Sequence, residues 1–160
     1  MSAKTMSFDH VKVGDELPAL AIDVTATTIV GGALASRDFT PVHHDKTKAQ
    51  AQGLPDVIMN TMTTNGFVSR FVTDWTGPTG RIGRMKFRMR DSVFPGDLMT
   101  FRATVTGTES DSHDCGWVDL DVSLWVDDRV CSSCEVRVAI PVDADDNPWM
   151  RRGSNWQPVG

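Results

Sequence analysis

Apolar and polar residues alternate along most of the second half of the chain, from Arg81 onward. Such alternation is typical of a strand with one face on the core and the other in solvent. It is clearest in Arg84–Arg90, where Met and Phe alternate with basic residues, and in Trp117–Trp125. With Asp127-Asp128 as a hairpin turn, the pattern predicts four successive antiparallel strands. These lie at residues 81–90, Leu98–Gly107, Gly116–Val126 and Arg129–Ile140.

The first half of the chain lacks this alternation and predicts different elements. Leu20–Val30 is rich in Ile, Val and Thr and predicts a first strand, which Gly31-Gly32 would end. A short helix is expected next, at Ala33–Arg37. From Val57 to about Thr73, apolar residues recur at a loosely helical spacing, over a length that predicts a buried helix.

Between these elements lies the segment Ser36-Arg-Asp-Phe-Thr-Pro-Val-His-His-Asp45. Pro41 fixes its own φ and favours extended geometry in the residue before it, so Asp38 and His43 are expected on a turn-like loop. A carboxylate beside an imidazole can serve acid/base chemistry and hold a water molecule. The alternative is purely structural: an Asx-turn at Asp38 and an N-cap at Asp45 for a following helix, with the histidines exposed.

The residues Asp38-Phe-Thr-Pro-Val-His43, followed by Asp45 and Ala49, resemble the hydratase motif of the MaoC-like family. Its members are (R)-specific enoyl-CoA hydratases and dehydratases with a hot-dog fold. This chain departs from the usual family pattern in three places. Thr40 replaces an Asn, Arg37 replaces a frequent Gly, and Asn60-Thr61 replaces the His-Gly of single-chain members.

The detailed match runs from about Ala33 to Pro78 and resembles one subgroup most, the small subunit of the two-subunit enoyl-CoA hydratase that actinobacteria use on steroid side chains. The resemblance implies an α+β fold: a single hot-dog domain, residues 1–142, with a long central helix wrapped by a five-stranded antiparallel sheet. The predicted order of strand, long helix and four strands agrees with this fold independently. Residues 143–160 form an irregular tail, whose Trp149 and Trp156 either fold back over the domain or contact a neighbouring subunit.

The resemblance also implies a reaction, the addition of water to the α,β double bond of a bulky, steroid-type acyl-CoA. Asp38 and His43 would activate the water, with His43 as the base and Asp38 orienting it or relaying a proton. Backbone N–H groups near Asn60 or Thr61 would bind the enolate oxygen. No separate cofactor is implied, because CoA is part of the substrate. The expected partners are a second MaoC-like chain and, less directly, a thiolase-like aldolase.

Two other functions stay open. The chain could be a non-catalytic subunit that shapes an acyl-CoA tunnel, which Asn60-Thr61 favours and the Asp38/His43 pair opposes. It could also be a hydratase or dehydratase of ordinary fatty acyl thioesters; a thioesterase is less favoured, since hot-dog thioesterases do not need this loop. A bulky substrate is favoured by small or flexible residues of the long helix, which predict a wide pocket. These are Thr61, Met62, Thr63, Thr64 and Gly66.

Length and composition narrow the remaining possibilities. A chain of 160 residues suits one domain with a real core. The net charge of −5 argues against nucleic acid as a partner. No apolar run approaches the roughly 20 residues that span a bilayer. The N-terminus has no apolar segment of a secretory signal, so a reducing cytoplasm is expected, with the cysteines as thiols.

Two groups of side chains have both a structural and a functional interpretation. Cys131 and Cys134, with Cys115 and His113, suggest a metal site. Residues three apart on a strand point to opposite faces, however, and a closed zinc site needs four convergent ligands, so no metal is expected. The basic residues of the first predicted strand after the long helix either contact CoA phosphates or form a solvated strand face. These are Arg81, Arg84, Lys86, Arg88 and Arg90.

Overall fold

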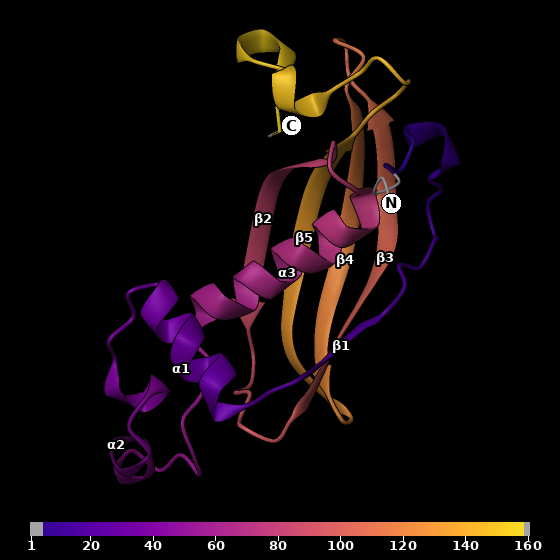
Figure 1. The fold of residues 1–160 in the computed structure, drawn as a ribbon. Helices are drawn as coiled ribbons and strands as arrows, with labels where there is room; N and C mark the ends of the chain where they lie inside the picture. The colour runs from indigo at the N-terminus through magenta and orange to yellow at the C-terminus, as the bar shows by residue number, and fades with distance from the viewer. Residues whose placement is uncertain (1–4, 159–160) are drawn as a thin grey trace.

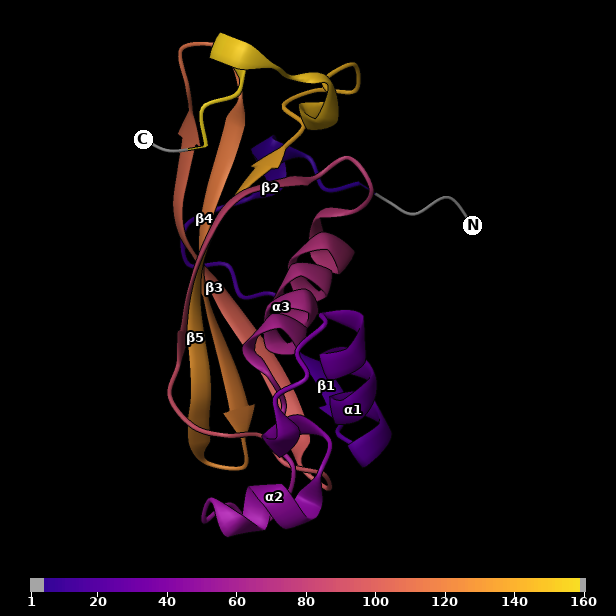
Figure 2. The ribbon, with the colours of Figure 1, turned by 90° about the vertical axis from the view of Figure 1, so that its left-hand side faces the viewer.

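The computed structural model describes residues 5–158, which form one curved antiparallel sheet with helices on one of its faces (Figures 1 and 2). The strands are β1 (Leu20–Asp23), β2 (Arg81–Met89), β3 (Leu98–Ser110), β4 (Gly116–Val126) and β5 (Arg129–Ile140). The α-helices are α1 (Ala26–Ala35), α2 (Lys46–Ala51) and α3 (Thr61–Thr76). Single 3₁₀ turns lie at Phe8–His10, Pro41–His43, Pro148–Met150 and Gly153–Asn155. The order of strands across the sheet is β1-β3-β4-β5-β2.

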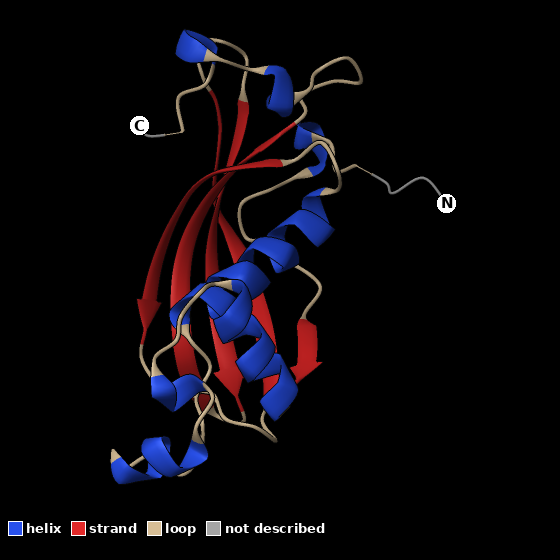
Figure 3. Ribbon diagram, turned by 60° about the vertical axis from the view of Figure 1, so that its left-hand side comes forward, coloured by secondary structure: helices blue, strands red, loops and turns tan. Residues whose placement is uncertain are grey.

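The long helix α3 crosses the concave face of this sheet (Figure 3). Its buried face carries Val68, Phe71 and Val72, which join the core built from β3, β4 and β5. Phe71 stacks on Phe101 of β3, with ring centroids 5.9 Å apart. Because β3 alternates between buried and exposed residues, it presents its apolar face to α3 and its polar face to solvent. The expected arrangement, a central helix wrapped by five antiparallel strands, is confirmed.

The prediction of a long first strand is wrong. Of the residues predicted as this strand, only Leu20–Asp23 pair with β3, and the chain then turns into α1. Thr25 begins this helix, because its side-chain oxygen accepts a hydrogen bond from the Thr28 N–H at 3.0 Å. The β-branched residues that suggested a strand therefore lie in a helix, which tertiary packing favours over their local propensity. The helix expected at Ala33–Arg37 is the last part of α1.

Gly32 does not end an element but lies within α1, where it allows close contact with α3. A Cβ added at Gly32 would lie 2.1 Å from the side-chain oxygen of Thr63 and 2.9 Å from its Cβ. A Cβ at the neighbouring Gly31 would have nothing within 4 Å. Gly32 is thus required by packing against α3, whereas Gly31 is not.

We predict opposite effects when these two glycines are replaced by alanine. Gly31→Ala should raise the free energy of unfolding by up to about 1 kcal/mol, since alanine favours a helix and meets open space. Gly32→Ala gains the same helix propensity but must displace the side chain of Thr63. It should therefore lower the free energy of unfolding by about 1–3 kcal/mol. Thermal and urea denaturation of the two variants measures the difference. Equal effects would contradict the proposed close contact between α1 and α3.

Candidate active site

The end of α1 delivers Asp38 to the site through a Schellman motif. The Arg37 N–H donates to the Leu34 carbonyl at 3.1 Å and the Asp38 N–H donates to the Ala33 carbonyl at 2.9 Å. Arg37 takes a left-handed conformation, with φ of 56°, at the position where glycine is usual. The position where the resemblance leads one to expect Gly is therefore the C′ residue of a helix.

His43 is brought to Asp38 by the 3₁₀ turn Pro41–His43 and is fixed by a long-range contact. Its Nδ1 lies 2.7 Å from the carbonyl oxygen of Ile58. A carbonyl only accepts hydrogen bonds, so Nδ1 carries the hydrogen and donates it. The imidazole side chain is only 11% exposed. The interpretation of both histidines as exposed is therefore wrong for His43, although it is right for His44.

The other nitrogen of His43 faces the carboxylate of Asp38. Nε2 of His43 and Oδ2 of Asp38 are 3.3 Å apart. In the neutral ring, Nε2 is the unprotonated nitrogen, because the hydrogen lies on Nδ1. Two acceptors this close are stabilised by a hydrogen between them. Either Nε2 carries this hydrogen, as part of an imidazolium, or a water molecule donates hydrogen bonds to both atoms. The structure thus brings together the two residues that the sequence predicts as the acid/base pair.

Asn60 holds the carboxylate in this position and begins α3. Its Oδ1 accepts a hydrogen bond from the Thr63 N–H at 3.0 Å, which makes Asn60 the N-cap. Its Nδ2 donates to Asp38 Oδ2 at 3.0 Å and to Ser36 Oγ at 2.8 Å. Both amide hydrogens are therefore used within the protein. Asn60 positions Asp38 and is also the polar residue at the helix start that the structural interpretation expected.

The start of α3 presents backbone N–H groups beside this pair. Thr61 and Met62 are the first two residues of the helix, so their N–H groups have no partner within it. Among the described residues, no other group accepts a hydrogen bond from them. Both residues are exposed. These groups, together with the positive end of the helix dipole, can bind an oxyanion.

The carboxyl group of Asp38 is held in its ionised form. The Thr40 hydroxyl donates to Oδ1 at 2.7 Å and is the main cause; the Asn60 amide and the Thr40 N–H add to it. Together they lower the pKa of Asp38 from 3.8 to about 2. Asp38 therefore stays a carboxylate throughout the neutral range and can orient or stabilise a cation.

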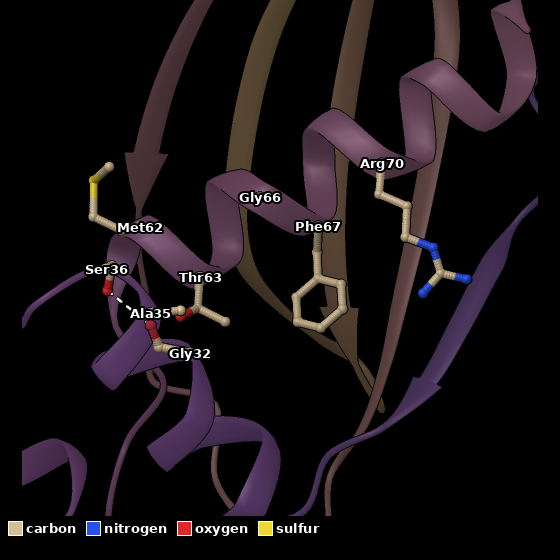
Figure 4. Close-up of a pocket in the computed structure, with 8 residues that line it drawn as sticks. All are labelled: Gly32, Ala35, Ser36, Met62, Thr63, Gly66, Phe67 and Arg70. Atoms are coloured by element: carbon tan, nitrogen blue, oxygen red, sulfur yellow. Dashed lines mark hydrogen bonds between the residues drawn. The ribbon is translucent and has the colours of Figure 1, made fainter. Parts of the chain in front are cut away.

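A cavity of about 420 Å³ lies between α1 and α3, and it reaches Ser36 but is not lined by Asp38 or His43 (Figure 4). Its lining is almost entirely apolar. Met62, Thr63 and Gly66 line it as predicted, whereas Thr64 is buried in the core and Thr61 lies outside the cavity. The sequence missed five lining residues, three at the end of α1 and two on α3, because nothing in the local pattern shows that these two helices pack side by side. They are Gly32, Ala35, Ser36, Phe67 and Arg70.

The cysteines lie apart from this site. Within residues 5–158, no group of three or more His, Cys, Asp or Glu side chains converges to hold a metal ion. Cys131 and Cys134 are nevertheless both buried, contrary to the expectation of opposite faces. A bulge in the pairing of β4 with β5, between Leu124 and Trp125, changes the alternation there. Burial raises the pKa of Cys134 to about 11, so its thiol stays protonated.

The tail after β5 folds back on the domain at the end of the sheet opposite α2 (Figure 1). Trp156 packs on Trp117, with ring centroids 4.9 Å apart, and Trp149 donates to the Gly80 carbonyl at 3.2 Å. This supports the first interpretation of the two tryptophans. Arg81 lies 3.6 Å from the Trp156 ring centroid. The Arg81 guanidinium is therefore occupied by the tail, unlike the exposed Arg84, Lys86 and Arg88 of β2 and Arg90, which follows it.

Comparison with known proteins agrees with this geometry. Residues 10–124 match the model of the MaoC like domain, which includes the whole loop and α3. The chain belongs to the MaoC-like dehydratase family. Within residues 5–158, this MaoC-like chain has no helix long and apolar enough to cross a membrane.

Two relatives from Mycobacterium tuberculosis are similar to this MaoC-like chain. The first is the 3-oxo-4,17-pregnadiene-20-carboxyl-CoA hydratase beta subunit, 45% identical over 94 residues, or 59% of this chain and 73% of the relative. The second is a chain in the crystal structure of the ChsH1-ChsH2 complex, with a TM-score of 0.75 and 35% identity over 81% of this chain and 98% of the other.

A more distant structure shows that the architecture is shared more widely. The (R)-hydratase from A. caviae involved in PHA biosynthesis has a TM-score of 0.74 and 21% identity, over 82% of this chain and 98% of the other. At that identity the likeness shows the fold alone. The MaoC-like chain therefore has the hot-dog fold predicted from its sequence.

We predict that removing the Thr40 hydroxyl raises the pKa of Asp38 toward 3.8, because the hydroxyl is the main cause of the low value. In Thr40→Val the carboxyl should titrate between about 2 and 3.8, because the Asn60 amide and the residue-40 N–H still lower its pKa, whereas Thr40→Ser should keep the wild-type behaviour. Carboxyl-carbon NMR during an acid titration measures both. The wild-type contribution to stability is present above pH 3.8 and is lost as the pH falls toward about 2. Identical titrations in the two variants would contradict this account.

Proposed function

We propose that this chain is a catalytic subunit of an enoyl-CoA hydratase, with Asp38 and His43 activating the water. The observation that carries the proposal is the pairing of Asp38 Oδ2 with His43 Nε2 at 3.3 Å, with Asn60 holding the same carboxylate oxygen at 3.0 Å. A subunit that served only to shape a tunnel would not need a carboxylate and an imidazole fixed in this way. The family membership supports the reaction class.

The geometry suggests a division of roles between the two side chains. A water molecule between them gives one proton to His43 Nε2, and its oxygen forms the bond to Cβ of the substrate. The electrons of the double bond move onto the thioester oxygen, which the N–H groups of Thr61 and Met62 stabilise as an enolate. Nε2 then returns the proton to Cα. Asp38, with a pKa of about 2, stays ionised, orients the water and stabilises the transient imidazolium.

The cavity supports a bulky acyl group as the substrate. One end of the cavity is lined by Ser36, whose Oγ accepts a hydrogen bond from Asn60. Because Asn60 also holds Asp38, this end of the cavity is the one nearer the proposed acid/base pair. Its apolar lining and its volume of about 420 Å³ suit a fused-ring group better than a short chain. The relative named for a 3-oxo-4,17-pregnadiene-20-carboxyl-CoA substrate supports the same choice. We therefore propose a steroid-type enoyl-CoA.

We also propose that the chain works in a complex with a second MaoC-like chain. The curated relative is a beta subunit, and the solved one is part of a two-protein complex. Large apolar side chains near the site are exposed, with Phe39 at 65%, Met62 at 62% and Leu34 at 55%. A second subunit that covered them would bury this apolar surface. A thiolase-like aldolase stays a prediction from the resemblance alone.

The catalytic roles predict a sharp contrast between two adjacent histidines. In the complex purified by co-expression, His43→Ala and Asp38→Asn should each lower kcat for hydration by about 10²–10⁴-fold, because each disrupts the group that activates water. His44→Ala should retain near wild-type activity, since His44 is exposed and, within residues 5–158, its side chain forms no hydrogen bond or ion pair with Asp38 or His43. Circular dichroism checks that each variant is folded. Near-full activity in either site variant would contradict the catalytic assignment.

The shape of the cavity predicts a selective effect at Gly66, where an added Cβ would meet nothing within 4 Å. Gly66→Leu should fill this space and lower kcat/KM for a 3-keto-steroid enoyl-CoA by about tenfold or more, with little effect on crotonyl-CoA. Gly66→Ala is the matched control and should change kcat/KM for either substrate only slightly. Steady-state kinetics with both substrates measures this. An equal loss for crotonyl-CoA, or faster wild-type turnover of it, would instead indicate ordinary fatty acyl hydration.

A further inference from the structure

The apolar cavity between α1 and α3 has a charged side chain at the end away from the acid/base pair. Of the eight residues that line it, Arg70 alone is charged. Figure 4 shows Thr63, Phe67 and Arg70 on the same side of α3, with Ser36 at the opposite end of the cavity from Arg70. The spacing of these three residues follows the helical repeat, so they form one continuous wall.

Arg70 keeps most of its hydrogen-bonding capacity free. Its Nε donates to Asp74 Oδ2 at 3.3 Å, an exposed contact one helical turn away. Among the described residues, neither Nη group donates a hydrogen bond. A guanidinium has five N–H donors, so the Nη groups remain available to a ligand in the cavity. The Arg70 side chain is 55% exposed, so water hydrates these groups until a ligand in the cavity replaces it.

We propose that Arg70 is a specificity-determining residue that binds a neutral oxygen acceptor, such as a keto group, at the far end of the acyl group. This inference rests on the proposed hydratase function and names the substrate chemistry of the same site. The Nη groups supply the hydrogen bonds. Asp74 already balances the charge of Arg70 and would repel a carboxylate, so an uncharged oxygen fits better.

Distance also limits the acyl groups that can make this contact. From Thr63, beside the catalytic end, to Arg70 the helix rises by about 10 Å. A crotonyl group is too short to span that length, whereas a rigid fused-ring acyl group with a distal keto oxygen is long enough. A rigid ligand also loses little conformational entropy when it binds. The contact therefore favours ring substrates with a distal oxygen over ring substrates that lack it.

The test uses the co-expressed complex and three substrates: a 3-keto-steroid enoyl-CoA, its 3-deoxy analogue and crotonyl-CoA. Arg70→Met keeps an unbranched side chain of similar reach but removes the donors. It should lower kcat/KM for the keto substrate by about tenfold or more, as expected for loss of a hydrogen bond from a charged donor. The kcat/KM for the other two substrates should change by less than about twofold, because neither has a distal oxygen for Arg70 to bind. Arg102→Met, which replaces an exposed arginine of β3 outside the cavity, is the matched control and should change none.

The outcomes separate this inference from the proposed function. If Arg70→Met lowers kcat/KM equally for both ring substrates, or changes neither, while hydration persists, the Arg70 contact is refuted and the hydratase proposal stands. If the wild-type complex hydrates none of the three substrates, the proposed function fails and this inference fails with it. A loss confined to the keto substrate supports both.

Discussion

The hydrogen bonds of Asn60 connect the fold to the chemistry of the site. Its side-chain oxygen caps α3 through the Thr63 N–H, and its amide hydrogens bind Ser36 and Asp38. Asn60 is only 2% exposed, so each of these groups would be costly to leave unpaired. The end of α1, the start of α3 and the carboxylate are consequently fixed by one residue. The first N–H groups of α3 and the Asp38/His43 pair take their relative positions from this contact.

The close approach of α1 and α3 is the second constraint on the site. At Gly32 the two helices come so near that a Cβ would overlap the side chain of Thr63. A little farther along α3, Gly66 leaves open space instead, and the cavity forms there. The same helix pair is therefore tightly packed near Asp38 and His43 and open farther along α3. Under the proposed function, this combines rigid positioning of the pair with room for a bulky substrate.

The sequence predicted those features that depend on local patterns. Alternation identified β3 and β4, and the turn at Asp127-Asp128 follows from local chemistry, as Asp127 takes a positive φ of 53°. The error at Leu20–Val30 arose because β-branched residues favour strands, while the Thr25 cap and packing on α3 form a helix. The cavity wall on α1 was missed because it depends on the long-range packing of α1 against α3, which no local pattern shows. The equal burial of Cys131 and Cys134 depends on a bulge that no local pattern reveals.

The most important property of His43 also lay outside local prediction. The motif indicates that an imidazole lies near Asp38, but only the fold shows which nitrogen faces it. That choice is made by the Ile58 carbonyl, 15 residues away, which accepts a hydrogen bond from Nδ1. Ile58 lies in an irregular segment before α3, where its N–H donates to the Val42 carbonyl and the Met59 N–H donates to the Val93 carbonyl. These backbone contacts fix the carbonyl, the carbonyl fixes the tautomer, and the tautomer leaves Nε2 free to accept a proton. The basicity proposed for His43 is therefore a consequence of how the segment before α3 is tied to its neighbours.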